Sequence, residues 1–358
     1  MKEFGRKVIS WYKKNKRDLP WRNTEDPYKI WLSEVILQQT RVDQGMAYYH
    51  RFTETFLDVH ALAAASEDEI LKLWQGLGYY SRARNLHAAS KDIVERFNGD
   101  FPDNYDDIKS LKGIGEYTAA AIASFAFKLP HAVVDGNVFR LLSRYFGIKT
   151  PIDSSSGKKE FTELANRLLG NHQPHTFNQA MMEFGSKQCK PVSPDCLNCP
   201  LQDTCFAFEK KMVSVLPVKS KKTKIRKRFF HYLVIREKDN FFIRQRKEKD
   251  IWIGLHDFPM IETETAISGN KVMSTKEWKT HFATKKSEVV RVSNEFKHIL
   301  SHQHIHATFY EIKSDLKMFK EEKQHWKKVN SDTVKEFAVP RLIEEYLKQM
   351  VQFKKPIN

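Results

Sequence analysis

All four cysteines of this 358-residue chain lie in one short stretch, CKPVSPDCLNCPLQDTC, with the spacing C-x6-C-x2-C-x5-C. Close cysteine clusters in a chain without a secretory leader usually bind metal rather than form disulfides. Structural zinc sites usually present two short cysteine pairs. Here one pair, Cys196 and Cys199, is flanked by the solitary Cys189 and Cys205. The spacing favours an iron–sulfur cluster, with zinc as the alternative.

Two carboxylates occupy positions suited to acid–base chemistry. Glu34 lies in IWLSEVILQQTRV, whose helical perimeter is almost entirely apolar, so we expect a buried side chain with the raised pKa of a proton donor. The alternative is a structural glutamate bonded to Gln38 or Arg41. Asp135 precedes the amphipathic GNVFRLLSRYF and is expected to cap that helix. If Asn137 caps instead, Asp135 remains an ionised carboxylate that can stabilise a developing cation.

A glycine turn precedes another helix in LKGIGEYTAAAIASFAF. Gly113 and Gly115 allow a phosphate to approach the backbone, and the N–H groups at the helix start can bind it. This pattern predicts a helix-hairpin-helix element near residues 105–125, although an ordinary glycine-containing connection is the simpler alternative. The net charge of +16 and the pI near 9.5 also indicate a polyanionic partner such as nucleic acid.

The elements that must position these residues change character along the chain. Helical apolar spacing extends to about residue 210, whereas RFFHYLVIRE and NFFIRQRKE predict strands, and PRLIEEYLKQMV predicts a closing helix. We therefore expect an all-α domain over residues 1–216 with a cluster loop at 189–205, a basic linker at 217–228, and an α+β domain over 229–358. With no apolar leader and no transmembrane stretch, a cytoplasmic, nucleoid-associated protein is expected.

These motifs together carry a family resemblance. LKGIGEYTA, VDGNV and the four cysteines resemble the helix-hairpin-helix DNA glycosylase superfamily that carries a [4Fe-4S] cluster. WLSEVILQQTRV, RDLPWR, GLGYYSRARNL and FNQAMMEFG resemble its adenine glycosylase (MutY) branch. The endonuclease III branch has a lysine nucleophile where this chain has Tyr117. The resemblance implies a cluster held by Cys189, Cys196, Cys199 and Cys205.

The activity implied is that of a monofunctional DNA glycosylase, a hydrolase that removes adenine mispaired with 8-oxoguanine or guanine in base excision repair. Its partner is double-stranded DNA with such mispairs, with no membrane, and a monomer is the default. One alternative is an endonuclease III-like bifunctional glycosylase and AP lyase acting on oxidised pyrimidines. Another is a DNA-binding or redox-sensing protein without catalysis.

The resemblance also assigns residue roles. Glu34 protonates the flipped adenine at N7 and then activates water, Asp135 stabilises the oxocarbenium-like sugar, and Tyr117 lies between them. The residues that match the adenine pocket are Arg17, Leu19, Trp21, Arg22 and Gln179. The residues that probe or wedge the base stack are Gln39, Thr40 and Tyr79. Core packing is the alternative for Trp21 and Tyr79.

The second domain resembles a MutT-like (degenerate nudix) recognition domain. DIWIGLHDFP matches its W-x-F-P stretch, but the R-E-x-x-E-E helix of nucleotide hydrolysis is missing, so a binding role is expected. The family reads 8-oxoguanine with a Phe-Ser-His loop, and here the string is Leu300, Ser301, His302. Leucine can wedge between bases but cannot stack as an aromatic ring does. The alternative is a strand turn with incidental histidines.

Overall fold

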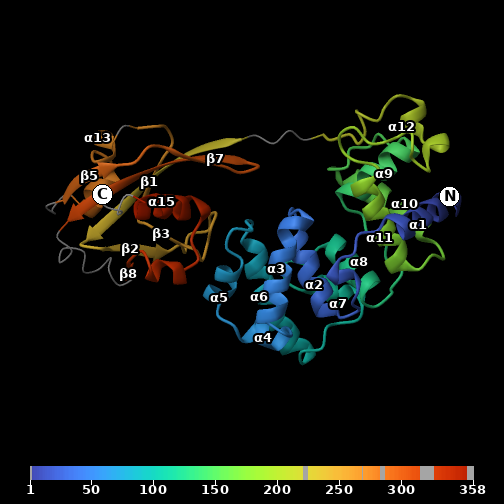
Figure 1. Cartoon of the computed structure of the whole chain (residues 1–358), viewed down its shortest axis with the longest axis horizontal. Helices are drawn as coiled ribbons and strands as arrows, with labels where there is room; N and C mark the ends of the chain where they lie inside the picture. The colour runs from blue at the N-terminus through green and yellow to red at the C-terminus, as the bar shows by residue number, and fades with distance from the viewer. Residues whose placement is uncertain (1, 221–224, 268, 283–286, 315–325, 353–358) are drawn as a thin grey trace. The chain divides into compact units, whose positions relative to one another are not determined.

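The computed structural model describes residues 2–220, 225–267, 269–282, 287–314 and 326–352 (Figure 1). It divides into two compact units. The first contains residues 1–64 and 85–222, and the second contains residues 65–84 and 223–358. None of the helices in the described ranges combines the length and apolarity needed to cross a bilayer.

The first unit is helical, as the sequence predicted. Several helices begin where the sequence supplies a start signal: proline opens α2 and α11, and Asp135 caps α9, which ends at left-handed Gly147. Its helices are α1 (Lys2–Asn15), η1 (Pro20–Arg22), α2 (Pro27–Leu37), α3 (Val42–Thr55), α4 (Val59–Ala64), α6 (Ser81–Phe97, which begins in the second unit), α7 (Tyr105–Ser110), α8 (Glu116–Phe125), α9 (Gly136–Phe146), α10 (Ser155–Leu169), α11 (Pro174–Lys187), η2 (Gln202–Thr204) and α12 (Phe206–Glu209).

Two parts of the helical core, one around α9 and one around α2, hold Asp135 and Glu34 in place. Large aromatic side chains from α1, α10 and α11, among them Phe4, Phe161 and Phe184, pack with the apolar face of α9. Separately, α2 packs against α3 and α8 and is buried on nearly all sides. Because α2 is buried, a polar side chain in its middle is removed from water.

The second unit is built on a mixed sheet. Its central strand β1 pairs in parallel with β7 and antiparallel with β2 and β4. The main strand order is β3-β2-β1-β7-β5, with β6 paired to β7 and β8 paired to β2. The elements are α5 (Glu67–Leu73), β1 (Arg226–Glu237), β2 (Asn240–Gln245), β3 (His256–Asp257), β4 (Met260–Thr263), α13 (Gly269–Val272), α14 (Lys276–Phe282), β5 (Ser287–Val292), β6 (Phe296–Ile299), β7 (Gln303–Ser314), β8 (Trp326–Val329), η5 (Thr333–Glu336) and α15 (Arg341–Gln352).

The predicted strands and closing helix are confirmed. β1 and β2 form a hairpin that turns at Lys238, whose φ is +55°. Helix α15 lies against the sheet (Figure 1), where Tyr346 stacks on Phe309 with 3.9 Å between ring centroids. One boundary differs, since β1 already begins at Arg226, inside the segment expected as a linker. Its residues pair with β7 from Arg226 onward.

Residues 65–84 pack on the second unit, although the sequence placed them in the helical domain. Lys72 Nζ donates to the Phe337 carbonyl at 3.2 Å, and Arg84 Nη1 donates to the Ile253 carbonyl at 2.7 Å. Gly254 has a φ of +83°, and a Cβ there would lie 2.7 Å from Leu71 Cδ1, so the two segments approach closely at this point. These contacts agree with the grouping of this segment with the sheet.

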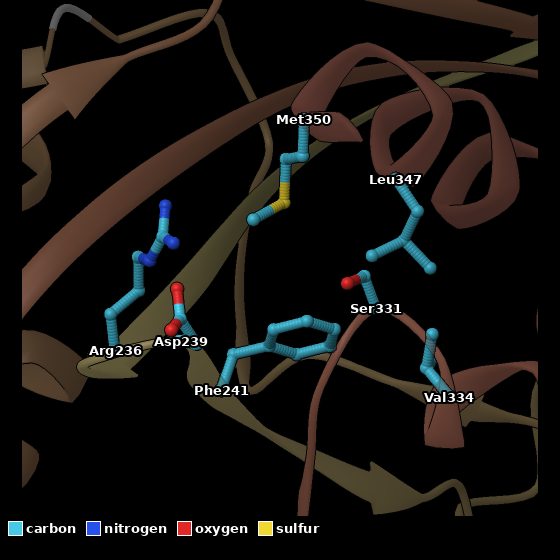
Figure 2. A pocket seen from close by; sticks show the side chains of 7 residues that line it. All are labelled: Arg236, Asp239, Phe241, Ser331, Val334, Leu347 and Met350. Carbon is cyan, nitrogen blue, oxygen red and sulfur yellow. The ribbon is translucent and has the colours of Figure 1, made fainter. Parts of the chain in front are cut away.

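A small apolar pocket lies beneath α15 (Figure 2). Leu347 and Met350 of α15 face Phe241 of β2, with Val334 beside them. Its volume of about 30 Å³ accommodates little more than one or two waters. We therefore regard it as a packing gap rather than a ligand site.

Candidate active site

A cavity of about 410 Å³ opens in the first unit, between η1, α2, α8, α11 and the start of α9. It collects most of the site residues that the sequence predicted for catalysis and base recognition. Those lining it are Arg17, Leu19, Trp21, Arg22, Glu34, Thr40, Tyr117, Asp135 and Gln179. Its size and mixed polar and apolar walls suit a single base or nucleoside.

Glu34 lies in the buried middle of α2 and is 7% exposed. Burial raises the pKa of its carboxyl to about 7. Tyr117 of α8 donates a hydrogen bond of 2.8 Å to Glu34 Oε2, and burial raises the pKa of that hydroxyl well above its usual value. The Gln38 amide donates to Thr118 Oγ1. At neutral pH a substantial fraction of Glu34 is therefore protonated inside the cavity.

Asp135 is the N-cap of α9, so the alternative in which Asn137 caps is wrong. Its Oδ1 accepts from Asn137 N at 3.0 Å and Val138 N at 2.8 Å, while Asn137 Nδ2 donates to Oδ2 at 2.6 Å. Burial raises the pKa of Asp135 despite these bonds, each of which lowers it. The cap fixes a carboxylate in the cavity wall, so capping and catalysis do not exclude each other here.

Helix α9 also ties Asp135 to the cysteine loop. Arg140 Nη2 donates to Asn137 Oδ1 at 2.9 Å, and Arg140 Nε donates to the Cys189 carbonyl at 2.8 Å. Gly185 lets α11 approach closely, since a Cβ there would lie 2.5 Å from the Asn137 carbonyl oxygen. The side chains of Arg140 and Asn137 therefore connect the cysteine loop to Asp135, so that a movement of the loop can shift this carboxylate.

The four cysteines line one common hollow closed by apolar side chains. Leu141, Phe184 and Leu201 cover it, and Arg144 Nη1 lies 3.5 Å from Cys189 Sγ. Across the described ranges, no three His, Cys, Asp or Glu side chains converge on the position of a single ion. Four cysteine sulfurs around one hollow are a donor set that an iron–sulfur cluster uses, and the apolar cover would keep water from it.

Glu183 of α11 is a cavity residue that the sequence analysis missed. It accepts hydrogen bonds from Arg17 Nη2 at 2.7 Å and from Arg22 Nη2 at 2.8 Å. A signal was present in FNQAMMEFG, since Gln179 and Glu183 are four residues apart and therefore share one face of a helix. The side-chain oxygen Oε1 of Gln179 accepts a hydrogen bond from the hydroxyl of Tyr12 at 2.7 Å.

The glycine turn has the geometry expected of a phosphate-binding hairpin. Gly113 has φ +79°, and a Cβ at that position would lie 2.6 Å from Asn85 Cβ. Gly115 caps α8 and faces open space. The free N–H groups at the start of α8 are therefore accessible to a backbone phosphate.

The remaining predicted DNA contacts lie elsewhere. Gln39 is outside the cavity lining and has a φ of +53°. Tyr79 has a φ of +47° and is 46% exposed, so core packing does not explain it. Within the second unit, its hydroxyl lies 3.4 Å from Ser301 Oγ. Ser301 and His302 are exposed at the turn between β6 and β7, whereas Leu300 is half-buried.

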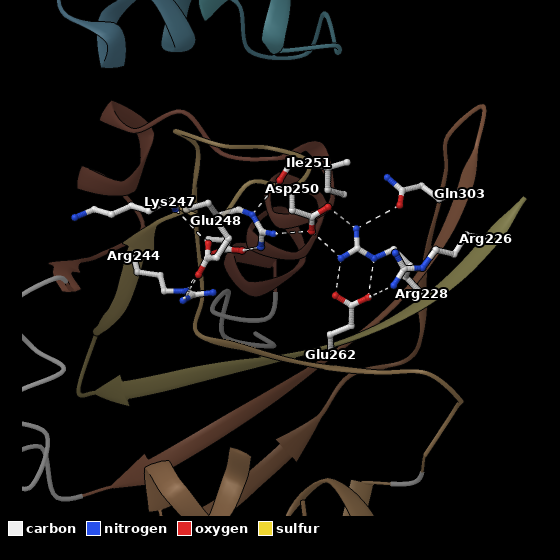
Figure 3. A network of polar contacts seen from close by, with 11 residues as sticks. Arg226, Arg228, Arg244, Lys247, Glu248, Asp250, Ile251, Glu262 and Gln303 are labelled. Carbon is white, nitrogen blue, oxygen red and sulfur yellow. Dashed lines mark hydrogen bonds and ion pairs between the residues drawn. The ribbon is translucent and has the colours of Figure 1, made fainter. Parts of the chain in front are cut away.

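Several carboxylates of the second unit pair with arginines (Figure 3). Arg228 Nη2 contacts both Asp250 Oδ2, at 2.6 Å, and Glu262 Oε2, at 2.5 Å. Arg246 Nη1 contacts Asp257 Oδ2 at 2.7 Å, and Asp257 is fully buried. Two guanidinium groups therefore pair with Asp250, Glu262 and Asp257.

Comparison with known proteins agrees with this architecture. Residues 32–167 match the HhH-GPD superfamily of base excision DNA repair proteins, and residues 231–349 match the NUDIX domain. A solved thermostable thymine-DNA glycosylase superposes with a TM-score of 0.55 at 30% identity, covering 58% of this chain and 96% of that one. A trapped endonuclease III–DNA intermediate shares the fold, with a TM-score of 0.52 at 23% identity over 59% of this chain and 97% of that one.

Fold and site thus define a helix-hairpin-helix DNA glycosylase, a hydrolase of N-glycosyl bonds in base excision repair, followed by a NUDIX domain. The adenine DNA glycosylase of Buchnera aphidicola subsp. Acyrthosiphon pisum (strain APS) is 31% identical over 356 residues, covering 99% of this chain and 98% of that protein. The Mus musculus adenine DNA glycosylase is 41% identical over 216 residues, covering 58% of this chain and 42% of that protein. The chain therefore belongs to the adenine DNA glycosylase family, which confirms the predicted family and fold class.

Proposed function

We propose that this protein removes adenine mispaired with 8-oxoguanine or guanine from duplex DNA. The observation that carries the proposal is the Glu34 carboxyl, which is buried and has a pKa of about 7 in a cavity the size of a nucleoside. A general acid works best with a pKa near the operating pH. Adenine is released more easily once its ring is protonated, so such an acid suits this base.

The chemistry follows from the side chains that face the cavity. The adenine must leave the base stack to enter it. Glu34 gives its proton to N7, which weakens the N-glycosidic bond as positive charge develops on the sugar. Asp135 lies in the same cavity and stabilises that charge, and Tyr117 orients Glu34 through its hydrogen bond. The resulting Glu34 carboxylate then activates the water that attacks the sugar carbon.

The reaction ends at base removal without strand cleavage. Lyase action needs an amine that forms a Schiff base with the sugar. The cavity side chains that the structure describes include no lysine, and Tyr117 occupies the position of the lysine in the bifunctional branch. This arrangement supports a monofunctional glycosylase over the endonuclease III-like alternative.

Residues 1–216 are assigned to excision and residues 229–358 to recognition of the lesion. Ser301 and His302 offer exposed hydrogen-bonding groups at a hairpin turn, and Tyr79 lies beside Ser301. The engagement of Asp250, Glu262 and Asp257 by arginines supports binding rather than pyrophosphate hydrolysis. The cysteines Cys189, Cys196, Cys199 and Cys205 would hold a [4Fe-4S] cluster, which cross-links the loop beside α9.

The test is single-turnover cleavage of a duplex with one adenine opposite 8-oxoguanine, with and without alkali after the reaction. Breakage at the adenine only after alkali is the expected result. Breakage without alkali would show lyase action. An intact strand under both conditions, with the iron content confirmed, would refute adenine removal and direct attention to oxidised pyrimidines.

A further inference from the structure

Glu183 is a buried carboxylate in the cavity wall that the chemistry above does not use. Its side chain has no exposed surface. Removing a carboxylate from water is costly unless its oxygens are paired. Both oxygens are paired here, and their partners belong to Arg17 and Arg22, the two arginines of the predicted adenine pocket.

The contacts fix the plane and position of both guanidinium groups. Arg17 forms a two-pronged pair, with Nε 2.8 Å from Oε1 and Nη2 2.7 Å from Oε2, and its backbone N donates to Oε1 at 3.1 Å. Arg22 Nη2 donates to Oε2 at 2.8 Å, while its Nη1 donates to the Arg17 carbonyl at 3.1 Å. Bidentate pairs of this kind impose orientation as well as attraction. Without Glu183, neither arginine keeps a charged partner on α11.

We propose that Glu183 is a positioning residue of the adenine site, whose carboxylate holds Arg17 and Arg22 so that their guanidinium groups meet the extruded purine in one fixed orientation. This inference rests on the proposed function, because it assigns the base in the cavity to adenine. Hydrogen-bond donors fixed in this way suit the ring nitrogens of a purine, which accept hydrogen bonds. A misplacement of about 1 Å at such a site can cost roughly a hundredfold in rate.

The Glu183 carboxylate also offsets the positive charges of Arg17 and Arg22 near Glu34. Burial raises the pKa of Glu183, but hydrogen bonds from Arg17 and Arg22 outweigh it and hold that pKa at about 2, so Glu183 stays ionised. The groups that act on Glu34 are Tyr117 and Arg22, which lower its pKa, and Asp135, which raises it. The other charged side chains of the cavity are Arg41 and Asp43. Removing the Glu183 charge leaves the two arginines less compensated and lowers the pKa of Glu34.

The experiment compares Glu183→Gln with wild type in single-turnover release of adenine opposite 8-oxoguanine across pH 5 to 9. Glutamine keeps the shape and removes the charge. We expect a rate about ten- to a hundredfold lower at its optimum. We also expect the loss of activity at high pH to begin at lower pH than in wild type. A purely structural defect would lower the rate without moving that limb of the profile.

Two further variants make the result decisive. Glu160→Gln removes an exposed charge from α10 and should match wild type. The double variant Arg17→Gln, Glu183→Gln restores the net charge and leaves one arginine, instead of two, without its carboxylate partner if the single variant does not fold. It should return the high-pH limb to the wild-type position while the rate stays low. A wild-type rate and pH profile in Glu183→Gln, or a wild-type rate in the double variant, would overturn the role of Glu183 and leave the proposed function standing. A wild-type protein that releases no adenine would refute the proposed function as well.

Discussion

The hydroxyl of Tyr117 donates a hydrogen bond of 2.8 Å to Oε2 of Glu34, which is buried, whereas Tyr117 is half-buried. Burial raises the pKa of Glu34, while this bond lowers it. The value of about 7 is therefore a balance between two opposing influences. One residue on α8 thus tunes the acid on α2, and changing it should move the pH dependence of the reaction in a known direction.

Replacing Tyr117 by phenylalanine removes the hydrogen bond and keeps the ring. Because the bond favours the ionised carboxylate, its loss should raise the pKa of Glu34 further. We expect the high-pH limb of the rate profile to move to higher pH, with a rate about two- to tenfold lower from the loss of one orienting bond. Single-turnover adenine release across pH 5 to 9 measures both effects. A limb that moves to lower pH would contradict the pairing.

Glu34→Gln should remove most of the adenine release and leave binding of the mispaired duplex nearly intact. Glutamine cannot give a proton to N7, and general acid catalysis typically contributes about 10²- to 10⁴-fold. In wild type the rate should decline as pH rises through about 7, because Glu34 then loses the proton it must donate. Rates and equilibrium binding measured on one duplex separate the two effects. Full activity in Glu34→Gln would remove this residue from the mechanism.

Glu34→Gln should also stabilise the folded protein at high pH. The pKa of Glu34 is 4.5 in its ordinary state and about 7 in the fold, so the folded state binds this proton more tightly. Stability from this group is present below pH 4.5 and is lost as pH rises to about 7. The variant cannot ionise at this position. Its free energy of unfolding, measured relative to wild type, should therefore be higher at pH 8 than at pH 5 by up to about 3 kcal/mol. Urea denaturation of both proteins at pH 5 and pH 8 tests this. The prediction is refuted if the difference in free energy of unfolding between variant and wild type is the same at both pH values.

The sequence predicted the residues of the site better than it predicted their connections. Glu34 sits in a stretch whose apolar perimeter already implied burial, and the local pattern of Asp135 allowed capping. Glu183 could not be recognised in the same way, because its partners Arg17 and Arg22 lie more than 160 positions away in sequence. Local spacing carries information about one helix, whereas ion pairs between distant segments appear only once the chain is folded.

The grouping of residues 65–84 with the second unit was missed for a similar reason. Their capping box, with Ser66 and Glu69, predicts a helix but says nothing of what it packs against. The contacts that hold it, such as that of Leu71 with Gly254 and that of Lys72 with the Phe337 carbonyl, join residues distant in sequence. Strands β1 and β2, in contrast, follow from local runs rich in aromatic and β-branched residues, so they were predicted correctly.

The double variant Ser301→Ala, His302→Ala should mainly reduce the preference for 8-oxoguanine over guanine opposite adenine. Both side chains are exposed at a turn and offer hydrogen-bonding groups, and each lost base contact typically costs about 1–3 kcal/mol of discrimination. We expect the ratio of adenine release rates for the two mispairs to fall about tenfold or more. Glu264→Ala, an exposed residue of the same unit, serves as the control. An unchanged ratio would refute lesion reading by this hairpin.

Cys199→Ser should remove the cluster and weaken excision together. The four thiols share one hollow, and Cys189 is joined through Arg140 and Asn137 to Asp135. Loss of one ligand should abolish iron binding, release the loop and lower the rate of adenine release by about tenfold or more, since supporting contacts of metal sites typically contribute about 10- to 100-fold.

Iron analysis of the purified wild type should give about four iron atoms per chain. Ser193→Ala, an exposed change in the same loop, should keep both iron and activity. Zinc in place of iron in the wild type would refute the cluster assignment, and full activity in an iron-free Cys199→Ser protein would refute the coupling between the loop and Asp135.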